Sequence, residues 1–111
     1  MGKRAEKILI VFVTASSRAE ASKIAGALVT GRLVGCVSII PTVTSIFRWK
    51  GKVQKSQETL MMIKSTEGQY SAIERAIRTM HSYDVPEIIS VPVIKGLPQY
   101  VDWLIGETTG N

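Results

Sequence analysis

Short apolar runs and segments of helical spacing alternate along the N-terminal part of the chain. A continuous run of aliphatic and β-branched residues predicts a first strand over residues 7–14, buried on both faces. Ser17 and Glu20 then have the spacing of a helix-capping box, and apolar residues recur every three to four positions up to Gly31. The pattern therefore predicts a buried strand followed by an amphipathic helix.

The middle of the chain predicts a long hairpin. Residues 35–49 are rich in Val, Ile, Thr and aromatic side chains and predict a second strand, and the apolar residues 60–63 place a third, antiparallel strand over residues 53–65. Residues 50–52, Lys-Gly-Lys, suit the turn between them. Because Pro41 has no N–H to donate to a ladder, the second strand should bend or bulge there.

The C-terminal part predicts a second helix, a strand and a third helix. Thr66 and Gln69 repeat the capping-box spacing, and an apolar stripe over residues 70–80 supports a helix after them. Residues 88–93 predict a fourth strand, which its internal Pro92 should confine to a sheet edge. Residues 97–105 suggest a short last helix with Pro98 in its first turn.

The predicted order of elements is β-α-β-β-α-β plus a C-terminal helix. This order is that of the ferredoxin-like α+β fold, an antiparallel sheet with two helices on one face. No repeat, linker or low-complexity segment divides the sequence, so residues 1–111 are expected to form a single domain with residues 1–6 as a disordered N-terminal extension.

Composition excludes several classes of protein. The 111 residues are 45% hydrophobic, enough for a core, and 14 Lys and Arg against 9 Asp and Glu give a net charge of +5. The longest apolar run is far shorter than the roughly 20 residues of a membrane-spanning helix, and no secretory signal precedes it, so we expect a cytoplasmic protein without a membrane partner. One cysteine and one histidine exclude an intrachain disulfide and a four-ligand zinc site within one chain.

The predicted hairpin is too long for a compact domain of this size. Each arm of about 14 residues would span about 45 Å at ~3.3 Å per residue, whereas a domain of this length has a diameter of about 35 Å. An overhanging ribbon would leave backbone groups unpaired and Phe47 and Trp49 in water, which favours pairing with another chain. The alternative is a hairpin that curls over its own subunit at Pro41.

Four segments carry a resemblance to a known family: residues 35–41 (GCVSIIP), 44–51 (TSIFRWKG), 63–66 (IKST) and 81–88 (HSYDVPEI). From about residue 8 to residue 104 the chain resembles the CutA family of divalent-cation tolerance proteins. The resemblance implies a ferredoxin-like subunit in a homotrimer of the PII type, binding of divalent cations with Cu²⁺ ahead of Zn²⁺, and no catalytic reaction. With one histidine in the chain, we expect this binding to be weak. The resemblance also implies that four residues line a cleft between subunits: Trp49, Glu58, Lys64 and Tyr83.

The sequence departs from the family pattern at three places. Residues 14–16, Thr-Ala-Ser, stand where a second cysteine is often found, so a thiol-pair metal site is not expected there. Ser38 replaces a common asparagine. Ser82 stands where a proline usually follows the histidine, and this change is expected to loosen the backbone before Tyr83 and to alter the direction of His81.

Three residues are candidate metal ligands. His81 follows the second predicted helix, and an imidazole is a good ligand for Cu²⁺ or Zn²⁺, to which Glu87 or Asp84 would add a carboxylate. The alternative for His81 is a helix cap or a surface hydrogen bond. Cys36 is a second candidate because a thiolate suits Cu⁺, or else it is a small residue of the core.

The cleft residues also permit a different function. Trp49 is expected to pack across a subunit interface, and Lys64 needs a partner such as Glu58 or Glu87 because it ends an apolar strand. A cleft with Lys64 and Tyr83 would alternatively hold a small anionic metabolite. A PII-like metabolite sensor is therefore the second candidate function.

Nucleic-acid binding and catalysis are not expected. The basic residues of the hairpin tip alternate with aromatic side chains, but no RNP1-like Gly-Phe run is present. Acylphosphatases share the predicted fold but need an anion-cradling loop with an arginine after the first strand, and the chain has no Gly-rich cradle there. The basic residues in question are Arg48, Lys50, Lys52 and Lys55.

Overall fold

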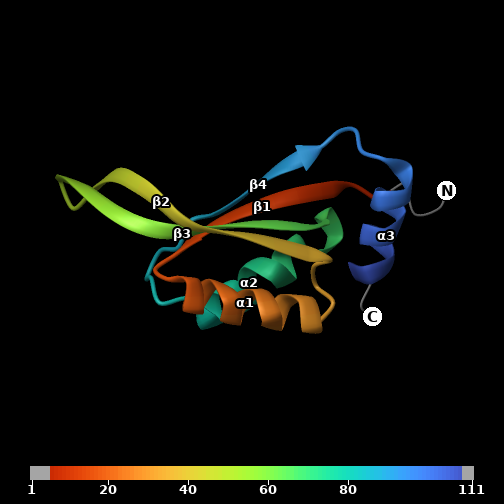
Figure 1. The fold of residues 1–111 in the computed structure, drawn as a ribbon, viewed down its shortest axis with the longest axis horizontal. Coiled ribbons are helices and arrows are strands. Elements are labelled where there is room, and N and C mark those ends of the chain that lie inside the picture. The colour runs from red at the N-terminus through yellow and green to blue at the C-terminus, as the bar shows by residue number, and fades with distance from the viewer. Residues whose placement is uncertain (1–5, 109–111) are drawn as a thin grey trace.

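The computed structural model describes residues 6–108, so most of the expected N-terminal extension, residues 1–5, lies outside the described residues. The elements follow the predicted order, with a 3-10 turn added before the second helix (Figure 1). Their bounds are β1 Ile8–Ala15, α1 Arg18–Thr30, β2 Cys36–Trp49, β3 Lys52–Thr66, η2 Glu67–Gln69, α2 Tyr70–Met80, β4 Ile88–Val93 and α3 Pro98–Thr108.

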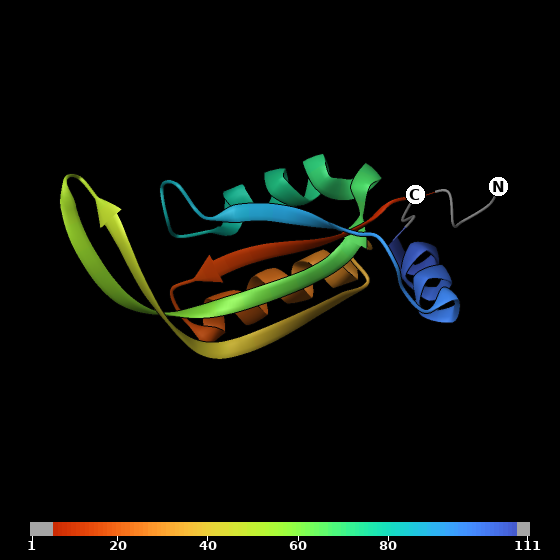
Figure 2. The same ribbon diagram turned by 90° about the horizontal axis from the view of Figure 1, so that it is seen from above.

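The strands form one antiparallel sheet in the order β2-β3-β1-β4. Helices α1 and α2 lie together against one face of the sheet, and α3 packs at the end opposite to the hairpin tip (Figures 1 and 2). The predicted ferredoxin-like α+β fold is confirmed. β4 is an edge strand, as its internal Pro92 predicted.

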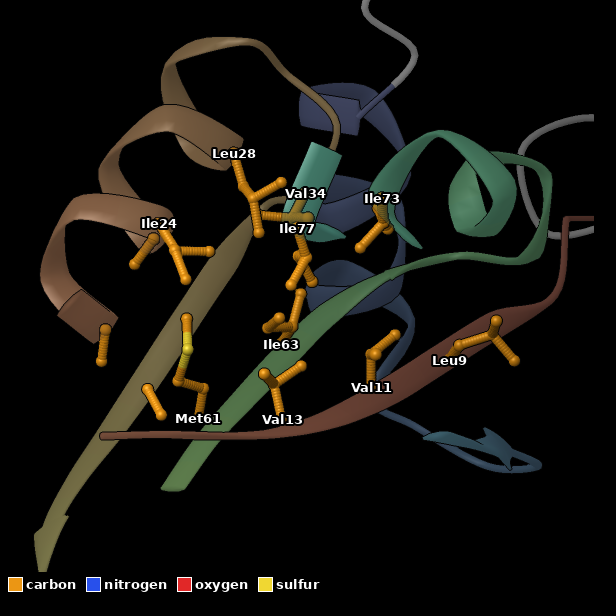
Figure 3. Close-up of a cluster of buried hydrophobic side chains, with 13 residues drawn as sticks. Leu9, Val11, Val13, Ile24, Leu28, Val34, Met61, Ile63, Ile73 and Ile77 are labelled. Atoms are coloured by element: carbon orange, nitrogen blue, oxygen red, sulfur yellow. The ribbon is translucent and has the colours of Figure 1, made fainter. Parts of the chain in front are cut away.

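The core lies between the sheet and the two helices (Figure 3). Alternate residues of β1, Leu9, Val11 and Val13, point toward the helices because side chains along a strand alternate between its faces. They meet side chains of three other elements that are less than 2% exposed: Ile24 and Leu28 of α1, Met61 and Ile63 of β3, and Ile73 and Ile77 of α2.

The opposite face of the sheet is apolar, and within residues 6–108 the only helix that packs against it is α3, at the end where Ile8 meets Leu104 and Ile105. The strand register places Phe12 between Met62 and Ile89, and Ile10 beside Val91. We call these five residues the open face; its Ile89 is 56% exposed and its Val91 44% exposed. The prediction that β1 is buried on both faces holds only in part for this chain alone: Ile8 and Thr14 are 7% exposed, but Ile10 and Phe12 between them are only half-buried.

The hairpin overhangs the rest of the domain, as its length predicted. β1 ends opposite Thr59, and beyond that point β2 and β3 pair only with each other. The ladder shifts register between Ile40 and Val43, which confirms the bulge expected at Pro41. The molecule consequently measures 50 × 25 × 22 Å.

The hairpin turn has the conformation that its sequence favours. Lys50 and Gly51 have φ angles of 51° and 79°, the left-handed pair typical of a tight turn that matches strand twist. Figure 2 shows that the ribbon also curves, so overhang and bend occur together.

One predicted capping box is partly confirmed and the other is wrong. Ser17 Oγ accepts the Glu20 N–H at 3.1 Å, but the Glu20 carboxylate binds the N–H of Ser16 instead of that of Ser17. Gly31 ends α1 as expected. Thr66 makes no side-chain cap because it is still the last residue of β3, and the 3-10 turn intervenes before α2 begins at Tyr70.

A matched pair of valines tests the position of the core. Val13→Ala removes two methyl groups from a fully buried site and should lower the free energy of unfolding by about 2 kcal/mol. Val29→Ala makes the same deletion on the outer side of α1, where Val29 is 43% exposed, and should change it by less than about 0.5 kcal/mol. Urea denaturation at one protein concentration measures both, and equal losses would contradict this core.

Candidate functional site

A cleft of about 730 Å³ lies where the hairpin leaves the domain. One wall is the hairpin and the other is the segment between α2 and β4, residues 81–87, which we call the 81–87 loop. Figure 2 shows the hairpin curving toward this loop. The lining residues are Thr14, Ser45, Ile46, Phe47, Trp49, Gln54, Ser56, Glu58, Tyr83, Asp84, Val85 and Glu87.

A hydrogen bond across the cleft joins its two walls. The Tyr83 hydroxyl donates to Glu58 Oε2 at 2.7 Å, and Glu58 is only 9% exposed. Burial, and then the Glu58 carboxylate, raise the pKa of the Tyr83 phenol well above its ordinary value. Tyr83 therefore stays protonated at neutral pH and acts as a donor to a carboxylate that β3 holds in place.

His81 is buried behind the loop, with both ring nitrogens in use. Its Nε2 lies 2.7 Å from the Thr14 carbonyl oxygen, and its Nδ1 accepts the Tyr83 N–H at 3.1 Å. These partners assign the ring proton to Nε2. The side chain is 0% exposed and offers no free lone pair to the cleft. His81 also forms the C-cap of α2, which was the alternative expected for it.

Glu20 of α1 reaches the 81–87 loop from outside the cleft. Its Oε1 accepts from the N–H and the hydroxyl of Ser16 at 2.9 and 2.8 Å, and its Oε2 accepts the Ser82 N–H at 2.7 Å. Burial by itself would raise the pKa of this carboxyl, but the bonds from Ser16 and Ser82 outweigh it and lower the pKa from 4.5 to about 2. Glu20 Oε2 also lies 3.8 Å from His81 Nδ1.

Ser82 stands where the family resemblance led us to expect a proline, and the loop is nevertheless supported at this position. The Ser82 N–H, which a proline would lack, is the group that donates to Glu20. Sequence reasoning identified Glu20 only as a cap, because nothing in the sequence indicates a contact between residues 62 positions apart.

Lys64 lies apart from the other expected cleft residues. Trp49, Glu58 and Tyr83 line the cleft together, as does Glu87. Lys64 is six residues beyond Glu58 on β3, about 20 Å at ~3.3 Å per residue. The carboxylates suggested as its partners, Glu58 and Glu87, are therefore not the groups it contacts.

Lys64 instead meets the start of β2 and α3. Its Nζ donates to Ser38 Oγ at 2.5 Å and lies 3.8 Å from Cys36 Sγ. Cys36 is half-buried and is not part of the core between sheet and helices. Burial, and then the Cys36 thiol, raise the pKa of the Tyr100 phenol, so α3 also contributes to this cluster.

The cleft is acidic although the chain is basic. Its lining includes the carboxylates Glu58, Asp84 and Glu87 and, among the described residues, no Lys or Arg, whereas the whole chain has a net charge of +5. Such a lining attracts cations. No group of three His, Cys, Asp or Glu within residues 6–108 is arranged to hold a metal, so His81, Cys36 and Glu87 do not form one site here.

The helices of the described part of the chain are all too short or too polar to cross a lipid bilayer.

Comparison with known proteins identifies relatives over nearly the whole chain. Residues 9–107 match the family model described as CutA1 divalent ion tolerance protein. The divalent-cation tolerance protein CutA of Thermus thermophilus is 42% identical over 101 residues, which cover 91% of this chain and 97% of that protein. Protein CutA of Mus musculus is 43% identical over 102 residues, which cover 90% of this chain but only 58% of the mouse protein.

Solved structures of related proteins have the same fold. The divalent cation tolerance protein of Thermus thermophilus superposes with a TM-score of 0.90 at 40% identity, covering 91% of this chain and 98% of that one. A protein from Archaeoglobus fulgidus described as periplasmic divalent cation tolerance protein CutA gives a TM-score of 0.89 at 31% identity, with 91% and 98% covered.

Acidification tests the hydrogen bonds of Glu20. Because its folded-state pKa of about 2 lies below the value of 4.5 expected without its partners, the carboxylate stabilises the fold at pH values above about 4.5. This contribution is lost as the pH falls through about 2. We expect the Tm of the wild type, measured by scanning calorimetry, to fall between about pH 5 and pH 2. In Glu20→Gln the Tm should fall less over this pH range than in the wild type. Parallel curves of Tm against pH for the two proteins would contradict the lowered pKa of Glu20.

Proposed function

The chain belongs to the CutA1 divalent ion tolerance family, and from this membership we propose that it acts in divalent-cation tolerance by binding divalent cations weakly in the cleft. We further propose that it does so without catalysis, as a homotrimer in the cytoplasm. Cu²⁺ is the first candidate ion and Zn²⁺ the second, following the order in which nitrogen, oxygen and sulfur donors bind these metals.

The acidic lining of the cleft carries the proposal. Three carboxylates face one cavity in a chain of net charge +5, so the cleft concentrates cations against the field of the rest of the molecule. Glu58 already accepts the Tyr83 hydroxyl, which leaves Asp84 and Glu87 as the exposed ligands on the loop. Two carboxylates and water make a weak site, in line with weak binding.

The proposed cleft site uses neither His81 nor Cys36 as a ligand. A metal that used His81 would have to displace the Tyr83 N–H or the Thr14 carbonyl from the ring. A hydrated ion held by Glu87 and Asp84 needs no such change. Cys36 lies in the Lys64 cluster, away from the cleft lining, and would bind copper there as a separate soft ligand.

The open face supports the homotrimer. An antiparallel sheet that carries helices on one side normally presents polar residues to water on the other. Here Phe12, Met62 and Ile89 stand in one row of that side, and the overhanging hairpin adds free ladder edges. Copies of the same chain would cover both features. A closed trimer would also bring a neighbouring subunit to the hairpin that forms one wall of the cleft.

No observation favours the alternative of a metabolite sensor. A cationic side chain would favour an anionic metabolite, and Lys64, the residue suggested for this role, lies outside the cleft of the described chain. The carboxylates that line the cleft would repel an anion.

Calorimetric titration with Cu²⁺ and then Zn²⁺ tests the cleft. Glu87→Gln should weaken binding at least about tenfold, or about 1.4 kcal/mol, because it removes one of two exposed carboxylates. Glu67→Gln makes the same charge change at an exposed site outside the cleft and should leave the affinity unchanged. Cys36→Ser decides whether any additional Cu²⁺ binding comes from the thiol. Identical isotherms for wild type and Glu87→Gln would contradict a cation site in the cleft.

Analytical ultracentrifugation tests the assembly. The wild type should sediment at three times the subunit mass of 12.2 kDa at micromolar concentration. Val91→Asp places a charge on the open face and should shift the protein toward monomers, since an unpaired charge in an interface is costly. Val29→Asp, at a site of nearly equal exposure on α1, should remain trimeric. The trimer is refuted if the wild type sediments as a single subunit.

A further inference from the structure

Glu20 connects two parts of the fold through its two carboxylate oxygens. Oε1 is taken by Ser16, next to the start of α1, and Oε2 accepts the N–H of Ser82 in the 81–87 loop. The cap of the helix is a separate bond, made by Ser17 to the Glu20 N–H. The Glu20 side chain therefore makes a bond to the loop that helix capping does not require.

The loop has no ladder bonds of its own over residues 82–87, so side chains hold it. Ser82 is bonded to Glu20, the Tyr83 N–H to His81 Nδ1, and the Tyr83 hydroxyl to Glu58. The loop then continues into Asp84 and Glu87, the exposed carboxylates of the cleft. Of these three bonds, the one from Ser82 to Glu20 lies nearest the start of the loop, and it is the one that connects the loop to α1.

We propose that Glu20 is a positioning residue for the cleft: through the Ser82 N–H it fixes the 81–87 loop and thereby the affinity of the cleft for its ligand. The effect on affinity rests on the proposed function, whereas the effect on the loop does not. Glu20 does not line the cleft, so it makes no direct contact with a ligand there, and the proposed effect is transmitted by the loop.

The chemistry of the bond requires a carboxylate. Ser16 and Ser82 together present four donors, an N–H and a hydroxyl from each, and only a group with acceptors on both terminal atoms satisfies both residues. In Glu20→Gln one terminal atom becomes an NH₂ group. The glutamine side chain can keep its amide oxygen on Ser16, but its NH₂ group then lies against the Ser82 N–H, and two donors cannot form a hydrogen bond. The substitution thus removes the bond to the loop while retaining size and the helix cap.

Hydrogen exchange of the backbone amides tests the effect on the loop directly. In Glu20→Gln the amides of Ser82 and Tyr83 should exchange at least about tenfold faster than in the wild type, because a bond to a charged acceptor is lost. Ser17→Ala is the matched control, since it removes the cap of the same helix and leaves the bonds from Ser16 and Ser82 to the Glu20 carboxylate in place. It should speed exchange of the Glu20 amide and not of Ser82 or Tyr83. Unchanged loop exchange in Glu20→Gln would overturn the proposal.

Titration with Cu²⁺ alone tests the effect on affinity. Glu20→Gln should bind at least about threefold more weakly than the wild type, and Ser17→Ala should bind as the wild type does. An equal loss in both variants would assign the effect to general destabilisation of α1 and overturn the positioning role.

A double-mutant cycle separates positioning from the loss of a negative charge. Ser82→Pro deletes the N–H that Glu20 accepts, and His81, with φ −78° and ψ 142°, already has the backbone conformation that precedes a proline. If Glu20 acts through this N–H, Glu20→Gln should have little further effect on Cu²⁺ affinity in the Ser82→Pro background. An undiminished effect there would show that charge alone matters. If the wild type binds no Cu²⁺, the proposed function fails, and the exchange experiment still decides whether Glu20 fixes the loop.

Discussion

The one-sided covering of the sheet is the constraint on which the rest of the structure depends. Helices α1 and α2 bury Val11 and Val13 on one face of β1, while Ile10 and Phe12, the intervening residues, point to the open face. A short strand cannot change this, because its side chains must alternate. The apolar residues in the middle of the second face are then left half-buried or exposed, and the proposed trimer would cover them together with the free edges of the hairpin.

Positively and negatively charged side chains occupy different parts of the hairpin region. The exposed tip carries Arg48, Lys50, Lys52 and Lys55, and the root, where the ribbon meets the 81–87 loop, carries the acidic cleft. These four cations account for most of the net charge of +5, so the remainder of the chain is close to neutral. The cleft is therefore not overwhelmed by the overall positive charge, and its carboxylates can determine which ions enter it.

The sequence was sufficient to predict the elements whose causes are local. The bulge at Pro41, the tight turn at Gly51 and the edge position of β4 depend on the N–H or the φ angle of single residues. The failures arose where a local pattern competed with a distant contact. Thr66 has the spacing of a cap but pairs with Ile8 in the sheet, and the apolar run of β1 does not reveal that Ile10 and Phe12, in the middle of its second face, are only half-buried by their own chain.

The residues that line the candidate site were predictable in part, since Lys64 lies outside the cleft, and their hydrogen bonds were not predictable. Trp49, Glu58, Tyr83 and Glu87 do line one cleft, because the hairpin curves toward the 81–87 loop. Whether a histidine presents a free nitrogen depends on the backbone groups around it, and both ring nitrogens of His81 are hydrogen-bonded to such groups. A motif records which residue types are present, whereas metal binding depends on which lone pairs remain free.

The 81–87 loop shows how one residue type can replace another by a different physical means. A proline after His81 would hold the backbone by its ring, which fixes φ and removes an N–H. Serine fixes nothing by itself, but it restores the N–H, and Glu20 of α1 lies where a carboxylate can accept it. The restraint on the loop then comes from a distant helix instead of from the loop itself. A loop without ladder bonds can therefore be held in one conformation by a side chain of another element. The residue that does so here, Glu20, has a sequence context that indicates only a helix cap.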